Sequence, residues 1–211
     1  MTHSLDRRPR GFDAVILAGG AATRMGGRPK AGQTLAGRPL LHWVLDAAAG
    51  AHRRIVVGGA SQLPLPLPAD VLLRREHPVG AGPAAAVGAG VLAGDCDVVL
   101  VLATDLPLVA AAIGPLLDAV SASAPALLVD AEGRRNPLAA AWPRAVLARM
   151  CRRAGQLNGG LAGQPMRALL RDLDVIEVPD PDGWGADCDT VADLARFAAR
   201  LRAQPSADAP E

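Results

Sequence analysis

Residues 98–102, Val-Val-Leu-Val-Leu, constrain the fold most because they form an apolar run without polar alternation. A strand with one face in water alternates apolar and polar side chains, whereas a strand that is covered on both faces is apolar throughout. This run is therefore typical of a mostly parallel sheet with helices on both faces. We place the strand near the centre of such a sheet.

Other strand-like runs recur along the chain, and most are separated by segments with helical spacing, which is the rhythm of β-α units. Proline at the start and glycine just past the end mark several helical segments. The predicted fold is therefore α/β and doubly wound. Strands are predicted at 12–17, 54–57, 71–73, 98–102, 126–129, 138–142 and 174–178. Helices are predicted at 39–49, 83–93, 109–120, 143–153, 166–172 and 191–203.

The connecting segments have distinct compositions. The acidic turn 130–133, Asp-Ala-Glu-Gly, lies between two short strands and predicts a hairpin that gives the sheet a mixed edge. Alternate prolines at 61–68 predict an extended loop, because proline lacks the N–H that a sheet ladder needs. We expect a second, mobile loop at 155–165. We also expect a single domain at 1–203 and a disordered tail at 204–211.

Composition excludes several classes of protein. The formal net charge is +1, so no overall field favours nucleic acid or an anionic membrane. No run reaches the roughly 20 apolar residues of a membrane helix, and the first residues lack the apolar core of a signal peptide. We therefore expect a cytoplasmic protein. The three cysteines are far apart without a CxxC pair, which favours reduced thiols over a disulfide framework or a zinc site.

The segment 17–30, LAGGAATRMGGRPK, follows the first predicted strand and contains four glycines, three cations and no acid. A loop in this position of an open α/β sheet lies where ligands bind. Glycine N–H groups can approach a phosphate closely, and the cations add charge, so the segment favours a triphosphate. A tight turn with solvated cations is the alternative. The residues concerned are Gly19, Gly20, Arg24, Arg28 and Lys30.

Carboxylates that could hold a metal occur at two places. Asp105 comes directly after the buried strand, at the same edge of the sheet as the glycine loop. Asp187 and Asp189 lie two residues apart, so both can point the same way in an extended segment. Carboxylates and phosphates are the ligands that Mg²⁺ prefers. The alternative for Asp105 is a turn or a helix N-cap, and Asp189 could equally cap the helix predicted from residue 191.

Several segments together resemble the molybdenum cofactor guanylyltransferases and the related nucleotidyltransferases that share their fold. LAGGAATRMGGRPK is similar to the LAGGxSxRMGxxK signature of this family, and the resemblance continues in order over nearly the whole chain. It implies a Rossmann-like, three-layer nucleotidyltransferase fold. The further segments are 37–41 (GRPLL), 82–83 (GP), 105–107 (DLP), 135–138 (RNPL) and 187–190 (DCDT).

The resemblance also implies a catalytic site. Lys30 and Arg24 contact the phosphates, and Lys30, the only lysine in the chain, stabilises the charge that develops as pyrophosphate leaves. Asp105 binds Mg²⁺ and is catalytic, and Asp189 is the second metal ligand. Asp187 approaches either the metal or the acceptor. The residues expected to bind the nucleotide are Leu17, Ala18, Gly19, Gly20, Lys30, Gly58, Glu76, Gly82 and Asp105.

The chain departs at two positions from relatives that use GTP. Gly58-Gly59 stands where these relatives often carry an asparagine, and Glu76-His77 stands where they show an acid pair. A carboxylate at Glu76 could accept from the N1–H and the amine of guanine, a pair of donors that other bases lack. Trp184 could stack on an acceptor ring or cover the core. Asn136 fits either the acceptor pocket or an Asx turn.

From the resemblance we expect an Mg²⁺-dependent enzyme that transfers GMP from GTP to the phosphate of molybdopterin and releases pyrophosphate. The alternatives are a related enzyme that uses CTP or another acceptor, such as a sugar phosphate, and a nucleotide-binding module without turnover. The expected partners are GTP and a molybdopterin-type acceptor, together with molybdenum cofactor enzymes or their chaperones. Nucleic acid and membranes are not expected partners.

Overall fold

A computed structural model describes residues 11–19 and 29–203. Its strands are β1 (Phe12–Leu17), β2 (Thr34–Leu35), β3 (Arg38–Pro39), β4 (Arg53–Val57), β5 (Val71–Arg74), β6 (Val98–Ala103), β7 (Ala126–Val129), β8 (Arg135–Pro143) and β9 (Ile176–Pro179). Its α-helices are α1 (Leu40–Ala47), α2 (Pro83–Val91), α3 (Ala110–Ala119), α4 (Arg144–Leu157) and α5 (Val191–Ala203). Short 3-10 turns are η2 (Lys30–Gly32), η3 (Ala60–Gln62) and η4 (Met166–Ala168).

The main sheet has seven strands in the order β5-β4-β1-β6-β8-β7-β9, with β6 at its centre. All residues of β6 are buried, as the apolar run predicts. Parallel pairing joins β5, β4, β1 and β6, and also β7 and β9. β8 runs antiparallel to both β6 and β7, and the turn 130–133 joins it to β7. The predicted mostly parallel sheet and its hairpin are therefore confirmed.

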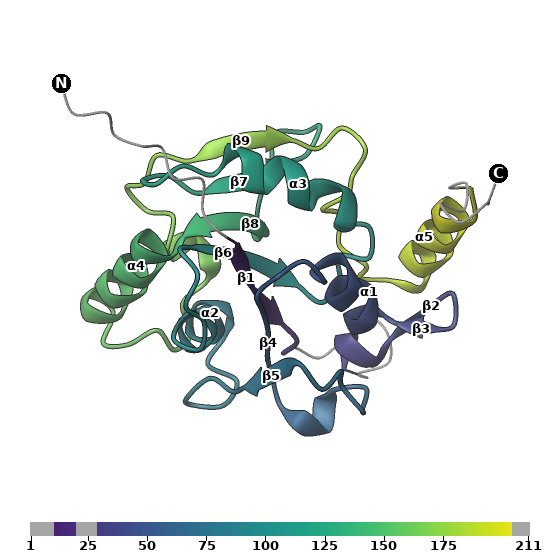
Figure 1. Cartoon of the computed structure of the whole chain (residues 1–211), viewed down its shortest axis with the longest axis horizontal. Helices are drawn as coiled ribbons and strands as arrows, with labels where there is room; N and C mark the ends of the chain where they lie inside the picture. The colour runs from purple at the N-terminus through teal and green to yellow at the C-terminus, as the bar shows by residue number, and fades with distance from the viewer. Residues whose placement is uncertain (1–10, 20–28, 204–211) are drawn as a thin grey trace.

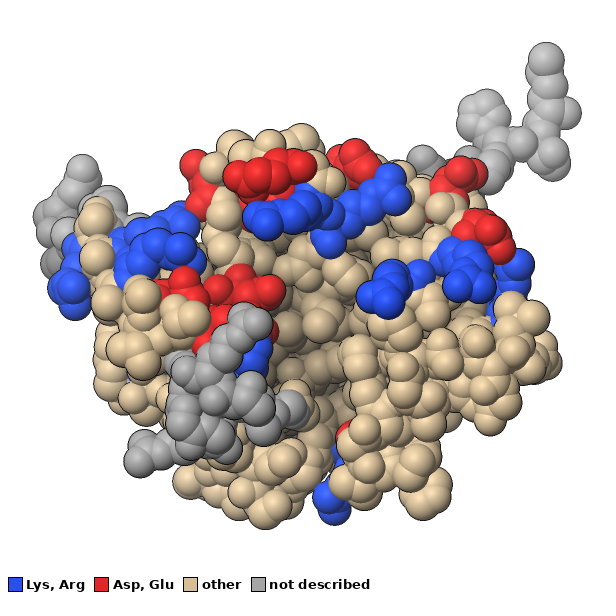
Figure 2. Space-filling view, turned by 180° about the vertical axis from the view of Figure 1, so that it is seen from behind, with Lys and Arg blue, Asp and Glu red and all other residues tan. Residues whose placement is uncertain are grey.

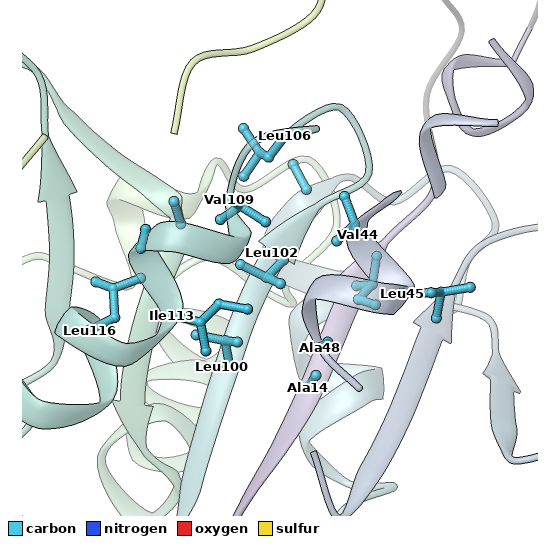
Figure 3. Packing of buried hydrophobic residues seen from close by; sticks show 14 of the residues in the cluster. Ala14, Val44, Leu45, Ala48, Leu100, Leu102, Leu106, Val109, Ile113 and Leu116 are labelled. Atoms are coloured by element: carbon cyan, nitrogen blue, oxygen red, sulfur yellow. The ribbon is translucent and has the colours of Figure 1, made fainter. Parts of the chain in front are cut away.

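Alternation along the central strands divides the core into two layers (Figure 1). On β1, Ala14 and Ile16 belong to the cluster that α1 and α3 cover, whereas Val15 and Leu17 belong to the cluster that α2 and α4 cover. Figure 3 shows the first cluster, in which side chains such as Leu45 and Ile113 point from their helices onto the sheet. The α/β fold with three layers is confirmed.

A smaller apolar cluster joins α5 to the hairpin of β2 and β3. Its buried members are Leu35, Leu40, Leu108, Cys188 and Phe197. The hairpin turns through Ala36 and Gly37, whose φ angles are 51° and 80°. Two-residue strands are too short to show an alternating pattern, so the sequence pattern does not predict this hairpin. In Figure 1, α5 lies at the side of the molecule near α1, β2 and β3.

Two predicted segments differ from the structure. A helix is expected at 166–172, but only the 3-10 turn η4 forms there. Beyond η4 the chain continues in turns, in which the N–H of Leu170 donates to the carbonyl of Arg167 at 3.2 Å, and Asp172, with a φ of 60°, ends the segment in a left-handed conformation. Helix α4 continues to Leu157, into the loop expected at 155–165. The proline-rich segment 61–68 contains no strand, as predicted, and residues 204–211 lie outside the described residues.

All three cysteines are free, as expected. None of the helices within residues 11–19 and 29–203 combines the length and the apolar character that crossing a bilayer requires.

A buried ion pair ties β1 to α4 at the edge of the sheet where β1 begins. Asp13 is fully buried, and its Oδ2 accepts from the backbone N–H groups of Asp95 at 2.7 Å and Cys96 at 2.8 Å. The same oxygen accepts from the guanidinium of Arg144, which also donates to two backbone carbonyls. A Cβ at Gly94 would lie 2.4 Å from Asp13 Oδ2, so glycine is required there.

Removing the cation of this pair should destabilise the fold. Arg144→Met should lower the free energy of unfolding by about 3–5 kcal/mol, because the carboxylate of Asp13 then stays buried without a positive charge beside it. Urea unfolding followed by circular dichroism measures this change.

A matched control lies on the same helix. Arg153 pairs with Asp172 at the surface, so Arg153→Met should cost at most about 1 kcal/mol. Adding Asp13→Asn to Arg144→Met should restore part of the lost stability. Similar losses for the two arginine variants would contradict the role given to the buried pair.

Candidate active site

Three segments that are distant in sequence meet at the carboxyl edge of β1 and β6. Lys30 begins η2, Asp105 follows β6, and Asp189 precedes α5. The ammonium Nζ of Lys30 donates to Asp105 Oδ2 at 2.7 Å and to Asp189 Oδ1. One lysine therefore bridges two carboxylates that are themselves 84 residues apart, from 105 to 189.

Backbone contacts explain why Asp105 and Asp189 come together. Cys188, buried against the cluster under α5, donates its N–H to the carbonyl of Asp105 at 2.9 Å. The N-terminus of α5 is capped reciprocally by Thr190 and Asp193: Asp193 N–H donates to Thr190 Oγ1 at 3.1 Å, and Thr190 N–H donates to Asp193 Oδ2 at 2.9 Å. Since this cap uses other side chains, the carboxylate of Asp189 is directed to Lys30.

The position of Asp105 rules out its alternative role as a helix N-cap. Helix α3 begins at Ala110, and the residue before it is Val109, which has no polar side chain. The side chain of Asp105 is 9% exposed and makes its ion pair with Lys30. Asp105 is therefore a nearly buried carboxylate at the carboxyl end of the central strand.

The side chains of this cluster shift one another's pKa values. Partial burial alone would lower the pKa of Lys30, but hydrogen bonds and charges from Asp105 and Asp189 raise it well above its ordinary value. Lys30 is therefore a permanent cation. Removal of water by the surrounding protein, together with the charges of Asp105 and Asp189, raises the pKa of Asp187 to about 6. Burial, with nearby acids, raises the pKa of Cys188 to about 12, so its thiol stays protonated.

Lys30, Asp105 and Asp187 line a cavity of about 1390 Å³. Figure 2 shows this face of the molecule, on which basic side chains gather around a hollow and acidic side chains lie beside it. The cavity is long enough to be lined by elements from both halves of the sheet, from Val57 at the end of β4 to Leu128 in β7. This volume exceeds the roughly 300–1,000 Å³ of a usual small-molecule site.

One end of the cavity is formed by glycine turns. Leu17 at the end of β1 and Gly19 just after it line this end, and Gly80 and Gly82 line it before α2. The φ angles of Gly80 and Gly82 are 75° and 90°, which other residues rarely adopt. Glu76 also lines the cavity, and its Oε1 accepts from the N–H of Gly80 at 2.9 Å. Helix α2 starts at Gly82-Pro83, and both residues line the cavity, so the N-terminus of the helix lies at the cavity wall.

The remaining residues predicted to bind nucleotide stand elsewhere. Ala18 is buried and donates its N–H to the carbonyl of Val57. Gly58 packs beneath it, where a Cβ would lie 3.2 Å from the carbonyl carbon of Ala18. Among the described residues, the cavity lining includes Glu76 but neither Gly58 nor the exposed His77. Gly20, Arg24 and Arg28 lie outside the described residues.

The other end of the cavity is rich in arginine, which the sequence analysis does not anticipate. The arginines come from β8 and the turn before it, and from α5. The four-residue spacing of the two on α5 is the one available signal, since it places them on the same side of a helix. The arginines of this end are Arg134, Arg135, Arg196 and Arg200.

Asn136 and Trp184 now have defined places. Asn136 lines the cavity, accepts from the N–H of Leu138 at 2.9 Å as in an Asx turn, and donates to the carbonyl of Gly185 at 2.8 Å. Both expected roles of Asn136 are therefore compatible. Trp184 packs against the core cluster under α1 and α3, which supports its role as a core residue.

The donor set at Lys30 suits a hard cation. Asp105 and Asp189 already share one cationic group, and carboxylate oxygens are the protein ligands that Mg²⁺ prefers. Within residues 11–19 and 29–203, three possible metal ligands converge in one place, at Asp13, Asp95 and Cys96. That group lies at the opposite edge of the sheet, where Arg144 already neutralises Asp13.

Comparison with known proteins identifies relatives for most of the chain. A family model described as MobA-like NTP transferase domain matches residues 14–176. A molybdenum cofactor guanylyltransferase from Cereibacter sphaeroides is 36% identical over 139 residues, which cover 63% of this chain and 69% of that protein. The bifunctional protein GlmU of Acidovorax sp. (strain JS42) is 41% identical over 115 residues, which cover 48% of this chain but only 24% of that protein.

A solved structure shares the fold. The molybdopterin-guanine dinucleotide biosynthesis protein A from Archaeoglobus fulgidus superposes with a TM-score of 0.64 at 20% identity, covering 91% of this chain and all of that one. The residues matched by the family model include Lys30 and Asp105. The resemblance found in the sequence is confirmed: the chain belongs to the family of MobA-like NTP transferase domains and is a nucleotidyltransferase.

Proposed function

We propose that this nucleotidyltransferase transfers GMP from GTP to the phosphate of molybdopterin and releases pyrophosphate. The observation that carries the proposal is the cluster of Lys30, Asp105 and Asp189, in which Lys30 and Asp105 line one cavity with glycine turns toward one end and arginines toward the other. The choice of donor and acceptor is supported by the 36% identical relative, whose name is molybdenum cofactor guanylyltransferase.

The glycine end suits the nucleotide. Gly19 and Gly82 bring backbone N–H groups to the cavity wall, and the N-terminus of α2 adds its positive dipole. Glu76 lies at the same end and supplies a carboxylate that can accept from the amine of guanine. We assign Glu76 to base recognition and Lys30 to the phosphates. We also retain Leu17, Ala18, Gly20 and Gly58 as proposed nucleotide contacts, with Arg24 as a second phosphate ligand.

The arginine end suits an anionic acceptor. Arg200 donates to the backbone carbonyl of Asp182 at 2.6 Å, which fixes its guanidinium at the cavity wall. Arg135 pairs with Glu177 at 2.6 Å and is oriented in the same way. Planar guanidinium groups held like this are well suited to a terminal phosphate. Asn136 adds an amide to this wall. These groups would position the acceptor phosphate.

Asp105 and Asp189 are the residues that we propose to hold Mg²⁺, and Asp187 stands beside them toward the acceptor. When bound there, Mg²⁺ neutralises negative charge on the reacting phosphate. Lys30 stabilises the charge that develops on the departing pyrophosphate, and its raised pKa keeps it protonated throughout. The acceptor oxygen attacks the α-phosphorus in line, and the chain contributes positioning and electrostatics without a covalent intermediate.

Removing the proposed metal ligand should abolish turnover. Asp105→Ala should slow Mg²⁺-dependent pyrophosphate release from GTP and molybdopterin at least about 100-fold, because charge at the reacting phosphate is no longer neutralised. A coupled pyrophosphate assay measures the rate. Asp172→Ala, which removes an exposed acid that does not line the cavity, should leave it unchanged. Retention of most activity by Asp105→Ala would refute the metal role.

A panel of nucleotides should identify the base. GTP should outperform CTP, ATP and UTP, and it should outperform inosine triphosphate by about 10-fold or more, because the latter lacks the amine that the Glu76 carboxylate accepts from. Glu76→Gln keeps an oxygen for the N–H of Gly80 but loses the charge, so it should reduce the preference for GTP over inosine triphosphate. Values of kcat/KM measure both effects. Faster turnover with CTP than with GTP would show that CTP, and not GTP, is the donor.

The cytoplasmic location, the single domain at 1–203 and contacts with molybdenum cofactor enzymes or their chaperones stay predictions.

A further inference from the structure

The ammonium of Lys30 contacts both carboxylates that the proposed function assigns to a metal ion. Its Nζ contacts Asp105 Oδ2 at 2.7 Å and also Asp189 Oδ1. The side chain of Lys30 is 26% exposed and that of Asp105 is 9% exposed, so this contact is partly shielded from water. A lysine ammonium therefore stands between the two carboxylates, at the point where they could share a metal ion.

A metal ion and this ammonium cannot use the same oxygens together. Mg²⁺ requires ligand oxygens at about 2.0–2.1 Å in a nearly octahedral arrangement. The ammonium already donates hydrogen bonds to these oxygens, and two cations held a few ångströms apart repel each other strongly when water is excluded. Binding of a metal by both Asp105 and Asp189 therefore requires the ammonium of Lys30 to move away.

The geometry around Lys30 allows this movement. Its backbone is held, because Gln33 donates its N–H to the carbonyl of Lys30 at 3.0 Å. Its side chain lines the cavity together with Gly19, and a lysine stem is flexible enough to turn its ammonium toward a different anion. The phosphates of a nucleotide bound by the glycine turns would offer that anion.

We propose that Lys30 is an internal counter-cation that keeps divalent metal off Asp105 and Asp189 until nucleotide phosphates draw its ammonium away. This inference rests on the proposed function, because it takes these two carboxylates as metal ligands. Metal and nucleotide then bind with positive coupling, and each strengthens the binding of the other by the same factor. Asp187 keeps the cluster rich in negative charge, so one cation or another occupies it at every stage.

Metal affinity without nucleotide tests the proposal directly. Mn²⁺ is titrated into the full chain, and free Mn²⁺ is measured by electron paramagnetic resonance. Lys30→Met should bind Mn²⁺ tighter than the unchanged chain by about 5- to 150-fold, the usual range of such couplings. Lys30→Arg keeps a cation and should bind Mn²⁺ weakly. Arg153→Met, which removes the same charge from an exposed ion pair, should match the unchanged chain.

A second measurement needs no variant of Lys30. Because Lys30 is the only lysine, acetylation of its amine by acetic anhydride can be followed by mass spectrometry without interference from other lysines. Saturating Mn²⁺ alone should release the ammonium from its carboxylates and speed acetylation of Lys30. Adding α,β-methylene-GTP should then protect the amine. Asp105→Ala should speed acetylation without any metal.

The outcomes separate this inference from the proposed function. Equal Mn²⁺ affinities for Lys30→Met and the unchanged chain, or Mn²⁺ binding without faster acetylation, would overturn the inference while leaving the metal site in place. Absence of Mn²⁺ binding to every variant, with or without the nucleotide analogue, would overturn the proposed metal ligands as well. If the Mn²⁺ results are as expected but GTP is not a donor, the inference stands and the proposed substrate fails.

Discussion

Parallel pairing of β1 with β6 is the constraint on which the rest of this structure depends. The pairing sets Leu17 opposite Ala103, so the glycine segment after β1 and Asp105 after β6 leave the sheet at the same edge. Both strands are covered by helices on their two faces, so a shift of register by one residue would turn each side chain to the other layer. The packing that stabilises the sheet therefore also fixes the distance across the candidate active site.

The candidate site concentrates negative charge and then balances it with one cation. Asp105 and Asp189 share the ammonium of Lys30, while Asp187 stands beside them with a raised pKa. In the proposed function this balance of charge links metal binding and catalysis at one point. The Asp13 and Arg144 pair at the opposite edge has a different character, because its cation is built into the fold and is held by backbone carbonyls.

The two ends of the cavity differ in the groups that they offer to a ligand. The end near Gly82 uses backbone groups and a helix N-terminus, which fit phosphates regardless of the base. The end near Arg200 uses guanidinium groups that are oriented by a carbonyl or a carboxylate. In the proposed function the reaction takes place at the Lys30 cluster and the arginine end holds the acceptor, so changes of side chain at that end would change the acceptor.

The sequence by itself determined the sheet, because apolar runs of strand length and helical spacing are local patterns that burial on two faces requires. The sequence also identified the glycine segment and the acid after β6 as candidate site residues, because each follows a predicted strand. Only the tertiary structure decided that Asp189 faces Lys30 while Thr190 and Asp193 cap α5, because both roles fit the same local sequence. It also decided the small hairpin of β2 and β3, the short turn η4 and the arginine end of the cavity. These features depend on contacts between segments far apart in the chain, and a local sequence pattern cannot predict such contacts.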